Sequence, residues 1–199
     1  GVLSETGQTI FTARAMLARW GLEDTVEPVP LGTYPRIYEA IARGEIASGI
    51  LTADYRFAGS SAHGMNALVN LGDEFGFQGP IIGTTRKIIA AQPDLVGLVV
   101  RGYVEAIHLF KTDRAAVLPL LRTHLCFEDA AAVEATYDFY VPRFQKLPLP
   151  SADGIARVIE QFRGRYPKAA QMTADDVCDL SFLRRLGKEG IIERLYGAV

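Results

Sequence analysis

Residues 1–82 alternate short apolar runs with stretches of helical periodicity, and this alternation constrains the fold more than any other feature of the chain. The apolar runs predict strands at 1–3, 26–29, 46–51 and 67–71. The stretches between them predict helices at 9–20, 33–43 and 54–62. Because strands that alternate with helices usually pair in parallel through right-handed crossovers, we expect an α/β lobe with a mostly parallel sheet.

The pattern after residue 82 is almost entirely helical. Apolar side chains at helical spacing predict helices at 93–111, 113–123, 129–144, 155–166, 181–186 and 191–195. Ser151, just after Pro148 and Pro150, is the expected cap of the fourth of these. Helices with one apolar stripe need a surface to cover, and apart from a short strand at 81–84 this part has none. We therefore expect that part of a second lobe is missing from the chain or comes from another chain.

The composition is that of an ordinary globular protein and argues against several classes of partner. The net charge is −2, with 21 basic and 23 acidic residues and no basic cluster, so no nucleic-acid partner is expected. The apolar runs are far shorter than the roughly 18 residues of a membrane span. The histidines are isolated, and Cys126 and Cys178 have no motif spacing, so neither a metal nor another cofactor is expected, and two buried thiols are favoured over a disulfide.

The first predicted strand turns through a small polar loop into a helix, which leaves the first N–H groups of that helix without partners. The loop places polar groups near these donors, at Ser4, Glu5, Thr6, Gly7 and Thr9. Convergent N–H groups and hydroxyls at a helix start suit an anion or a polar ligand head. The alternative is N-capping without a ligand, because Ser and Thr are common caps.

The next two strand-to-helix corners are further candidates, because such corners of a parallel sheet meet at the edge where ligands bind. They supply Gly32, Thr33, Tyr34, Thr52 and Asp54. Tyr34 could stack on a ligand or hydrogen-bond to it, whereas capping of the next helix is the favoured alternative for Asp54. Thr85, at the return into the helical part, is the last candidate. No acid/base pair or triad can be assembled, so no catalytic residue is assigned.

Several segments carry a family resemblance through their order and spacing. The first, 1–22, joins Gly-Val, a small polar loop and a helix that ends in Gly-Leu. The second, 32–47, joins Gly-Thr-x-Pro to Gly-x-Ile, with Ala47 in place of the usual Asp. Later landmarks lie at 84–89, 93–113, 137–140, 147–155 and 179–192. Together they resemble the substrate-binding proteins of ABC importers, in the nitrate/sulfonate/taurine and thiamine-precursor group.

The resemblance implies a periplasmic-binding-protein type II fold of two α/β lobes joined by a hinge. Residues 1–82 would form the complete second lobe, and 83–199 the hinge return and the mainly helical part of an incomplete first lobe. The family's longer N-terminal part would be missing here. Chains could then associate through the surface that this missing part leaves uncovered, although the sequence does not set an oligomeric state.

The resemblance also implies a function without catalysis. The chain would bind a small organic anion or a nitrogen/sulfur compound, such as a sulfonate, nitrate or pyrimidine, between the lobes. Hinge closure around the ligand would follow, because contacts made only in the closed state favour that state. The closed form would dock on the membrane permease of an ABC importer, in a periplasmic or extracytoplasmic location.

Two alternatives stay open at this point. The first is an enzyme on the same scaffold, of the thiamine-pyrimidine synthesis or carbon–sulfur cleavage type. It would need a reactive residue such as His63 or Cys126, and neither is tied by sequence to a carboxylate or nucleophile partner. The second is a relative that binds a ligand for regulation.

Overall fold

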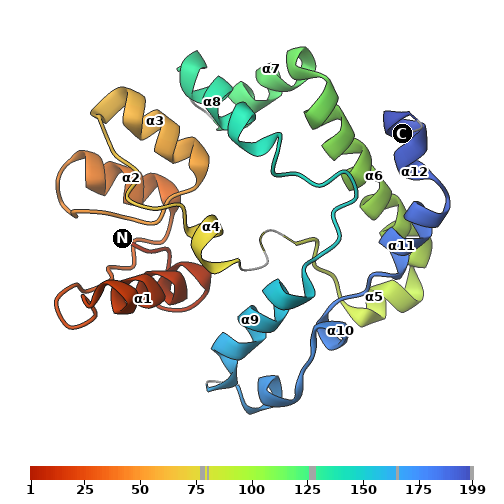
Figure 1. Cartoon of the computed structure of the whole chain (residues 1–199), viewed down its shortest axis with the longest axis horizontal. Coiled ribbons are helices and arrows are strands. Elements are labelled where there is room, and N and C mark those ends of the chain that lie inside the picture. Colours follow the sequence, from red (N-terminus) through yellow and green to blue (C-terminus); the bar gives the residue numbers. More distant parts are fainter. Residues whose placement is uncertain (77–78, 80, 126–128, 165, 198–199) are drawn as a thin grey trace. The chain divides into compact units, whose positions relative to one another are not determined.

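The computed structural model describes residues 1–76, 79, 81–125, 129–164 and 166–197. Contacts divide the chain into two compact units, each built from two segments. Unit 1 comprises Gly1–Phe75 and Leu120–Phe139, and unit 2 comprises Gly76–Pro119 and Tyr140–Val199. Figure 1 follows the order of the helices along the chain. The expected division into lobes at 1–82 and 83–199 stays a prediction.

The expected α/β fold class, with a periplasmic-binding-protein type II-like parallel sheet, is wrong. Helices take up 64% of the chain and strands 1%, and the described residues form no sheet, so the class is all-helical. The physical reason is that the strands predicted at 26–29, 67–71 and 81–84 do not bury their apolar side chains. Val26 and Val29 are exposed, Leu68 exposes 72% of its surface, and Ile81 exposes 74%. Pro28 also interrupts the second predicted strand, because proline has no N–H to donate to a ladder.

Three short extended segments, residues 1–3, 29–32 and 48–50, stand where most of the sheet was expected, and we call them the paired segments. The Val2 N–H donates to the Val29 carbonyl and the Leu31 N–H to the Val2 carbonyl, both at 2.9 Å, around a single parallel bridge between Val2 and Pro30. On the other side, the Gly1 amine donates to the Ser48 carbonyl at 2.7 Å and the Ile50 N–H to the Gly1 carbonyl at 3.0 Å. The segments therefore run parallel, but too briefly to form strands.

Unit 1 surrounds the paired segments with helices. They are α1 (Gln8–Trp20), α2 (Tyr34–Ala42), α3 (Ala53–His63), α4 (Leu71–Phe75), the end of α7 (Arg114–Leu125) and α8 (Ala130–Tyr140) as far as Phe139. The helices predicted at 9–20, 33–43 and 54–62 are confirmed as α1, α2 and α3. Gly21 ends α1 in the left-handed region, with φ of 67°, where glycine carries no steric penalty. Trp20, the last residue of α1, is 45% exposed.

The core of unit 1 is packed closely around Ile37 of α2, which is fully buried. A Cβ atom at Gly49 would lie 2.4 Å from Cγ2 of Ile37, so glycine is required for this approach of the third paired segment. On the far side of α3, the rings of Phe57 and Phe139 meet edge to face with centroids 5.9 Å apart, which joins α8 to the unit. An ion pair between Arg19 and Glu74 links α1 to α4.

Unit 2 is a helical assembly. Its elements are α5 (Arg86–Ala91), α6 (Pro93–Thr112), the start of α7, α9 (Ala152–Arg163), the 3₁₀ helix η1 (Pro167–Gln171), α10 (Ala174–Val177), α11 (Ser181–Lys188) and α12 (Ile191–Tyr196). Its core contains Val104 of α6, Leu186 of α11 and Ile191 of α12, with half-buried apolar residues packed around them. Ser151 caps α9 as predicted, because its hydroxyl accepts from the Gly154 N–H at 3.1 Å.

No helix in the described ranges has both the length and the apolar character needed to cross a membrane.

Candidate functional site

The paired segments bring three helix starts together in unit 1. Each segment leads within a few residues into a helix, α1 after Leu3, α2 after Gly32 and α3 after Ile50. Because the segments run parallel, their carboxyl ends lie at the same edge, and so do the N-termini of the three helices. A helix N-terminus carries partial positive charge and N–H donors without intrahelical partners, so this edge combines the dipoles of three helices with the carboxylates of Glu5 and Asp54.

The first corner, between Leu3 and α1, is held by its own hydroxyls. The Leu3 N–H donates to Oγ1 of Thr9 at 3.0 Å, and Thr9 is buried. The hydroxyl of Ser4 donates to the Thr6 carbonyl. Gly7 precedes the helix with φ of 102°, and no side chain caps α1. Thr9 and Ser4 therefore stabilise the loop, while the start of α1 has no side-chain cap.

Glu5 and Thr6 form the outer part of this corner. Both are exposed, whereas Ser4 and Gly7 are half-buried. A carboxylate at this place is favourable beside a helix N-terminus, and it is also an acceptor for the N–H groups of a ligand.

The second and third corners interact electrostatically, because Tyr34 of the second lies within reach of the charge of Asp54 in the third. Thr33 caps α2, its hydroxyl accepting from the Arg36 N–H at 3.4 Å, and the Gly32 N–H donates to the Leu3 carbonyl at 2.9 Å. Asp54 lies in the first turn of α3, after the N-cap residue Thr52, whose side chain makes no cap hydrogen bond. Burial, and secondarily the charge of Asp54, raise the pKa of Tyr34. Tyr34 thus stays a protonated hydrogen-bond donor at neutral pH.

An aromatic cluster extends from these two corners. The rings of Tyr34 and Tyr55 lie 6.3 Å apart, those of Tyr38 and Tyr55 5.5 Å, and those of Tyr38 and His63 5.6 Å. Burial raises the pKa of Tyr38 as well. Tyr38 and Tyr55 were not predicted as site residues. The available signals were the spacing of four residues between Tyr34 and Tyr38 and the position of Tyr55 directly after Asp54.

Thr85 is the one predicted site residue in unit 2. Its hydroxyl caps α5 by accepting from the Ile88 N–H at 3.2 Å. The other predicted site residues all belong to unit 1, where the three corners bring them to one edge.

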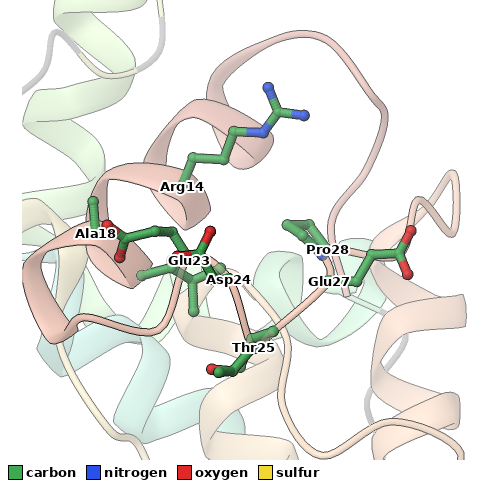
Figure 2. Close-up of a pocket in the computed structure, with 9 residues that line it drawn as sticks. Arg14, Ala18, Glu23, Asp24, Thr25, Glu27 and Pro28 are labelled. Atoms are coloured by element: carbon green, nitrogen blue, oxygen red, sulfur yellow. The ribbon is translucent and has the colours of Figure 1, made fainter.

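A hollow of about 680 Å³ lies elsewhere in unit 1, between α1 and the loop that follows it (Figure 2). It is lined by Arg14, Leu17, Ala18, Glu23, Asp24, Thr25, Val26, Glu27 and Pro28. The hollow is open to solvent and contains none of the predicted site residues. Its loop includes most of the segment predicted as a strand at 26–29, which is why this hollow was not foreseen.

The residues weighed for metal binding and catalysis include His63, which belongs to the aromatic cluster, and Cys178, which belongs to unit 2. Among the described residues, no three His, Cys, Asp or Glu side chains are grouped as a metal would need. Cys126 lies outside the described residues. Cys178 is a free thiol whose pKa is raised by burial and by Asp179 and Asp175, so it is a poorer nucleophile than an ordinary cysteine.

The chain was compared with protein-family models, with curated proteins and with solved structures, and nothing in any of the three matches it.

Proposed function

We propose that the chain binds a small organic anion or a nitrogen/sulfur compound, such as a sulfonate, nitrate or pyrimidine. The single observation that carries this proposal is the meeting of three helix N-termini at one edge of unit 1. Anionic groups bind at such positions through backbone N–H donors and the aligned peptide dipoles. The starts of α1 and α3 favour this reading because no side chain caps either helix.

The side chains around this edge suit a ligand with more than an anionic group. The protonated phenol of Tyr34 can donate a hydrogen bond, and its ring is a flat surface for a planar ligand. Asp54 and Glu5 can accept from N–H groups, which simple anions lack. This combination of donors, acceptors and rings favours nitrogen-containing compounds within the proposed class.

The biological role in this proposal is that of the solute-binding component of an ABC importer, or part of one. Support comes from the sequence segments that resemble that family. The partner would then be a membrane permease, and the location periplasmic or extracytoplasmic. Binding needs no nucleophile or metal, and the site is accordingly proposed as a binding site.

Ligand binding can be tested by thermal shift and calorimetry with sulfonates, nitrate, carboxylates and pyrimidines. We expect one class to raise the melting temperature of the protein. Tyr34→Phe and Asp54→Asn should each weaken that effect, because they remove a donor and a charged acceptor at the three corners. Tyr166→Phe, which changes a half-exposed tyrosine of unit 2, is the matched control and should bind normally. If no compound of these classes binds at millimolar concentration, the proposal fails.

A further inference from the structure

One face of α6 is exposed although the helix belongs to the core of unit 2. Val104 and Ile107 on its inner face are buried. The outer face carries an apolar and small-residue stripe made of Leu95, Leu98, Val99, Gly102, Tyr103, Ala106 and Leu109, all of them exposed. Leu98 exposes 66% of its surface. The residues recur every three or four positions, so they form one continuous surface, which we call the α6 stripe.

We propose that the α6 stripe is the contact surface between two copies of this chain. In the proposed pair, the two α6 helices pack antiparallel and cross between Gly102 and Tyr103. A contiguous exposed apolar surface of this kind marks an interaction site on a globular protein. The shape of the stripe and the charges beside it both indicate that the partner is a second copy.

The shape argument rests on the middle of the stripe. Apart from its chain neighbours and the backbone of α6 itself, no atom of the described residues lies within 4 Å of the place where a Cβ of Gly102 would stand, so the surface is open there. The next residue, Tyr103, exposes 37% of its surface. In an antiparallel pair that crosses at this point, the Gly102 backbones of the two copies approach each other on one side of the contact, and the two Tyr103 rings meet on the other side. Val99 then faces Ala106, so a large side chain meets a small one along the stripe, as interdigitated helices require.

The charge argument rests on Arg101 and Glu105, which flank the stripe on one side. Within one chain they form an ion pair at 2.7 Å, and both side chains remain about half exposed. In an antiparallel pair the same flanks face each other with the sequence reversed. Arg101 of one copy then lies within about 1.5 Å, along the axis, of the level of Glu105 on the other, given the helical rise. In a parallel pair this flank would instead face the opposite flank of the other helix, so only the antiparallel arrangement brings Arg101 and Glu105 of the two copies together.

The first test is the oligomeric state in sedimentation equilibrium over a wide concentration range. We expect a reversible dimer, and we expect Leu98→Glu to raise its dissociation constant at least roughly tenfold, as loss of an apolar anchor does. Val177→Glu is the matched control, because Val177 is also an exposed apolar residue of unit 2 but lies outside the stripe. A monomer at every concentration would overturn the proposal, and so would a dimer that Leu98→Glu leaves unchanged.

The second test separates the contact from the fold. Gly102→Leu places a side chain into open space on the single chain, so its melting temperature should not fall. In the dimer, two such side chains would meet where the two Gly102 backbones approach each other, so the dimer should weaken. A dimer that tolerates Gly102→Leu would contradict the proposed crossing point.

The third test addresses the antiparallel charge pairing. Arg101→Glu and Glu105→Arg should each weaken self-association, because every copy then meets like charges on the other. An equimolar mixture of the two variants should associate more strongly than either alone, since all facing charges are then opposite. If the mixture associates no better than the separate variants, the antiparallel pairing is wrong.

Discussion

The two units of this chain are built around different centres: unit 1 around short hydrogen-bonded extended segments, and unit 2 around apolar helix faces. Unit 1 is centred on the paired segments, and the buried polar residues of the described chain, Thr9, Thr12 and Thr136, all belong to it. Unit 2 has an apolar core around Val104, Leu186 and Ile191. Unit 1 brings three helix starts to one edge, and two of them have no side-chain cap, whereas in unit 2 Thr85 and Ser151 cap the starts of α5 and α9. This difference is why the proposed ligand site lies in unit 1.

The largest expected effect tests whether the two units unfold separately. Ile37→Ala should lower the free energy of unfolding of unit 1 by about 2–5 kcal/mol, because it opens a cavity beneath the paired segments. Ile191→Ala should do the same in unit 2, since Ile191 is 1% exposed. Native-state hydrogen exchange should show faster exchange mainly in the unit that carries the substitution. If either variant accelerates amide exchange equally in both units, the units do not unfold separately.

A second prediction concerns the buried hydroxyl of the first corner. Thr9→Val should cost about 1–3 kcal/mol of unfolding free energy, because the Leu3 N–H loses its acceptor in a partly buried place. Thr12→Val is the control, since that hydroxyl only donates to the Gln8 carbonyl of the same helix. Urea unfolding should show the larger loss for Thr9→Val. If Thr12→Val costs as much, the Leu3–Thr9 contact does not stabilise the corner.

A third prediction compares helix caps in the two units. Ser151→Ala in unit 2 and Thr33→Ala in unit 1 should each lower the unfolding free energy by about 1 kcal/mol, the usual value of a capping hydroxyl. Ser151→Asp should keep most of the stability, because aspartate also caps. Thermal unfolding measures both effects. A full loss in Ser151→Asp would show that Ser151 acts by packing instead.

The smallest expected effect is on pH dependence. A hydrogen bond from Ser61, and then one from the Ala131 N–H, lower the pKa of Asp129 in unit 1. Hydrogen bonds from the backbone and the hydroxyl of Thr173 lower the pKa of Asp176 in unit 2. Since both values are depressed by folding, the stabilisation is present above the ordinary carboxyl pKa and is lost as the pH falls through the folded values.

NMR titration of the side-chain carboxyl groups should show both shifts. Ser61→Ala should raise the pKa of Asp129 toward its ordinary value and leave that of Asp176 unchanged. If Asp129 titrates identically in the variant, the contact with Ser61 is absent in solution.

Most helices could be predicted from the sequence because their signals are local. Gly21 marks the end of α1, and Ser151 and Thr33 mark the starts of α9 and α2. The prediction of a sheet was wrong because an apolar run of three or four residues does not determine its own secondary structure. Val26 and Val29 are of the residue type favoured in strands, yet both are exposed: Val26 lies in the loop after α1, and Val29 lies at the start of the second paired segment.

The candidate site was only partly accessible from sequence, for a similar reason. Ser, Thr and Gly before a helical pattern indicate a corner, so the residues of the three corners could be named, although their part in binding stays a prediction. The aromatic cluster depends on the packing of α2 against α3, which places Tyr55 near Tyr34 and Tyr38. No local pattern contains that information, since the contact forms only between helices.

The position of Trp20 has a practical consequence for experiments. It is the only tryptophan of the chain, and it lies at the half-exposed end of α1, so indole fluorescence reports on unit 1 alone. Circular dichroism at 222 nm, in contrast, sums the helices of both units. When the two signals are recorded in one denaturant titration, their midpoints should coincide for a two-state protein and separate if the units unfold one after the other. The chain thus carries an intrinsic optical probe for one of its halves.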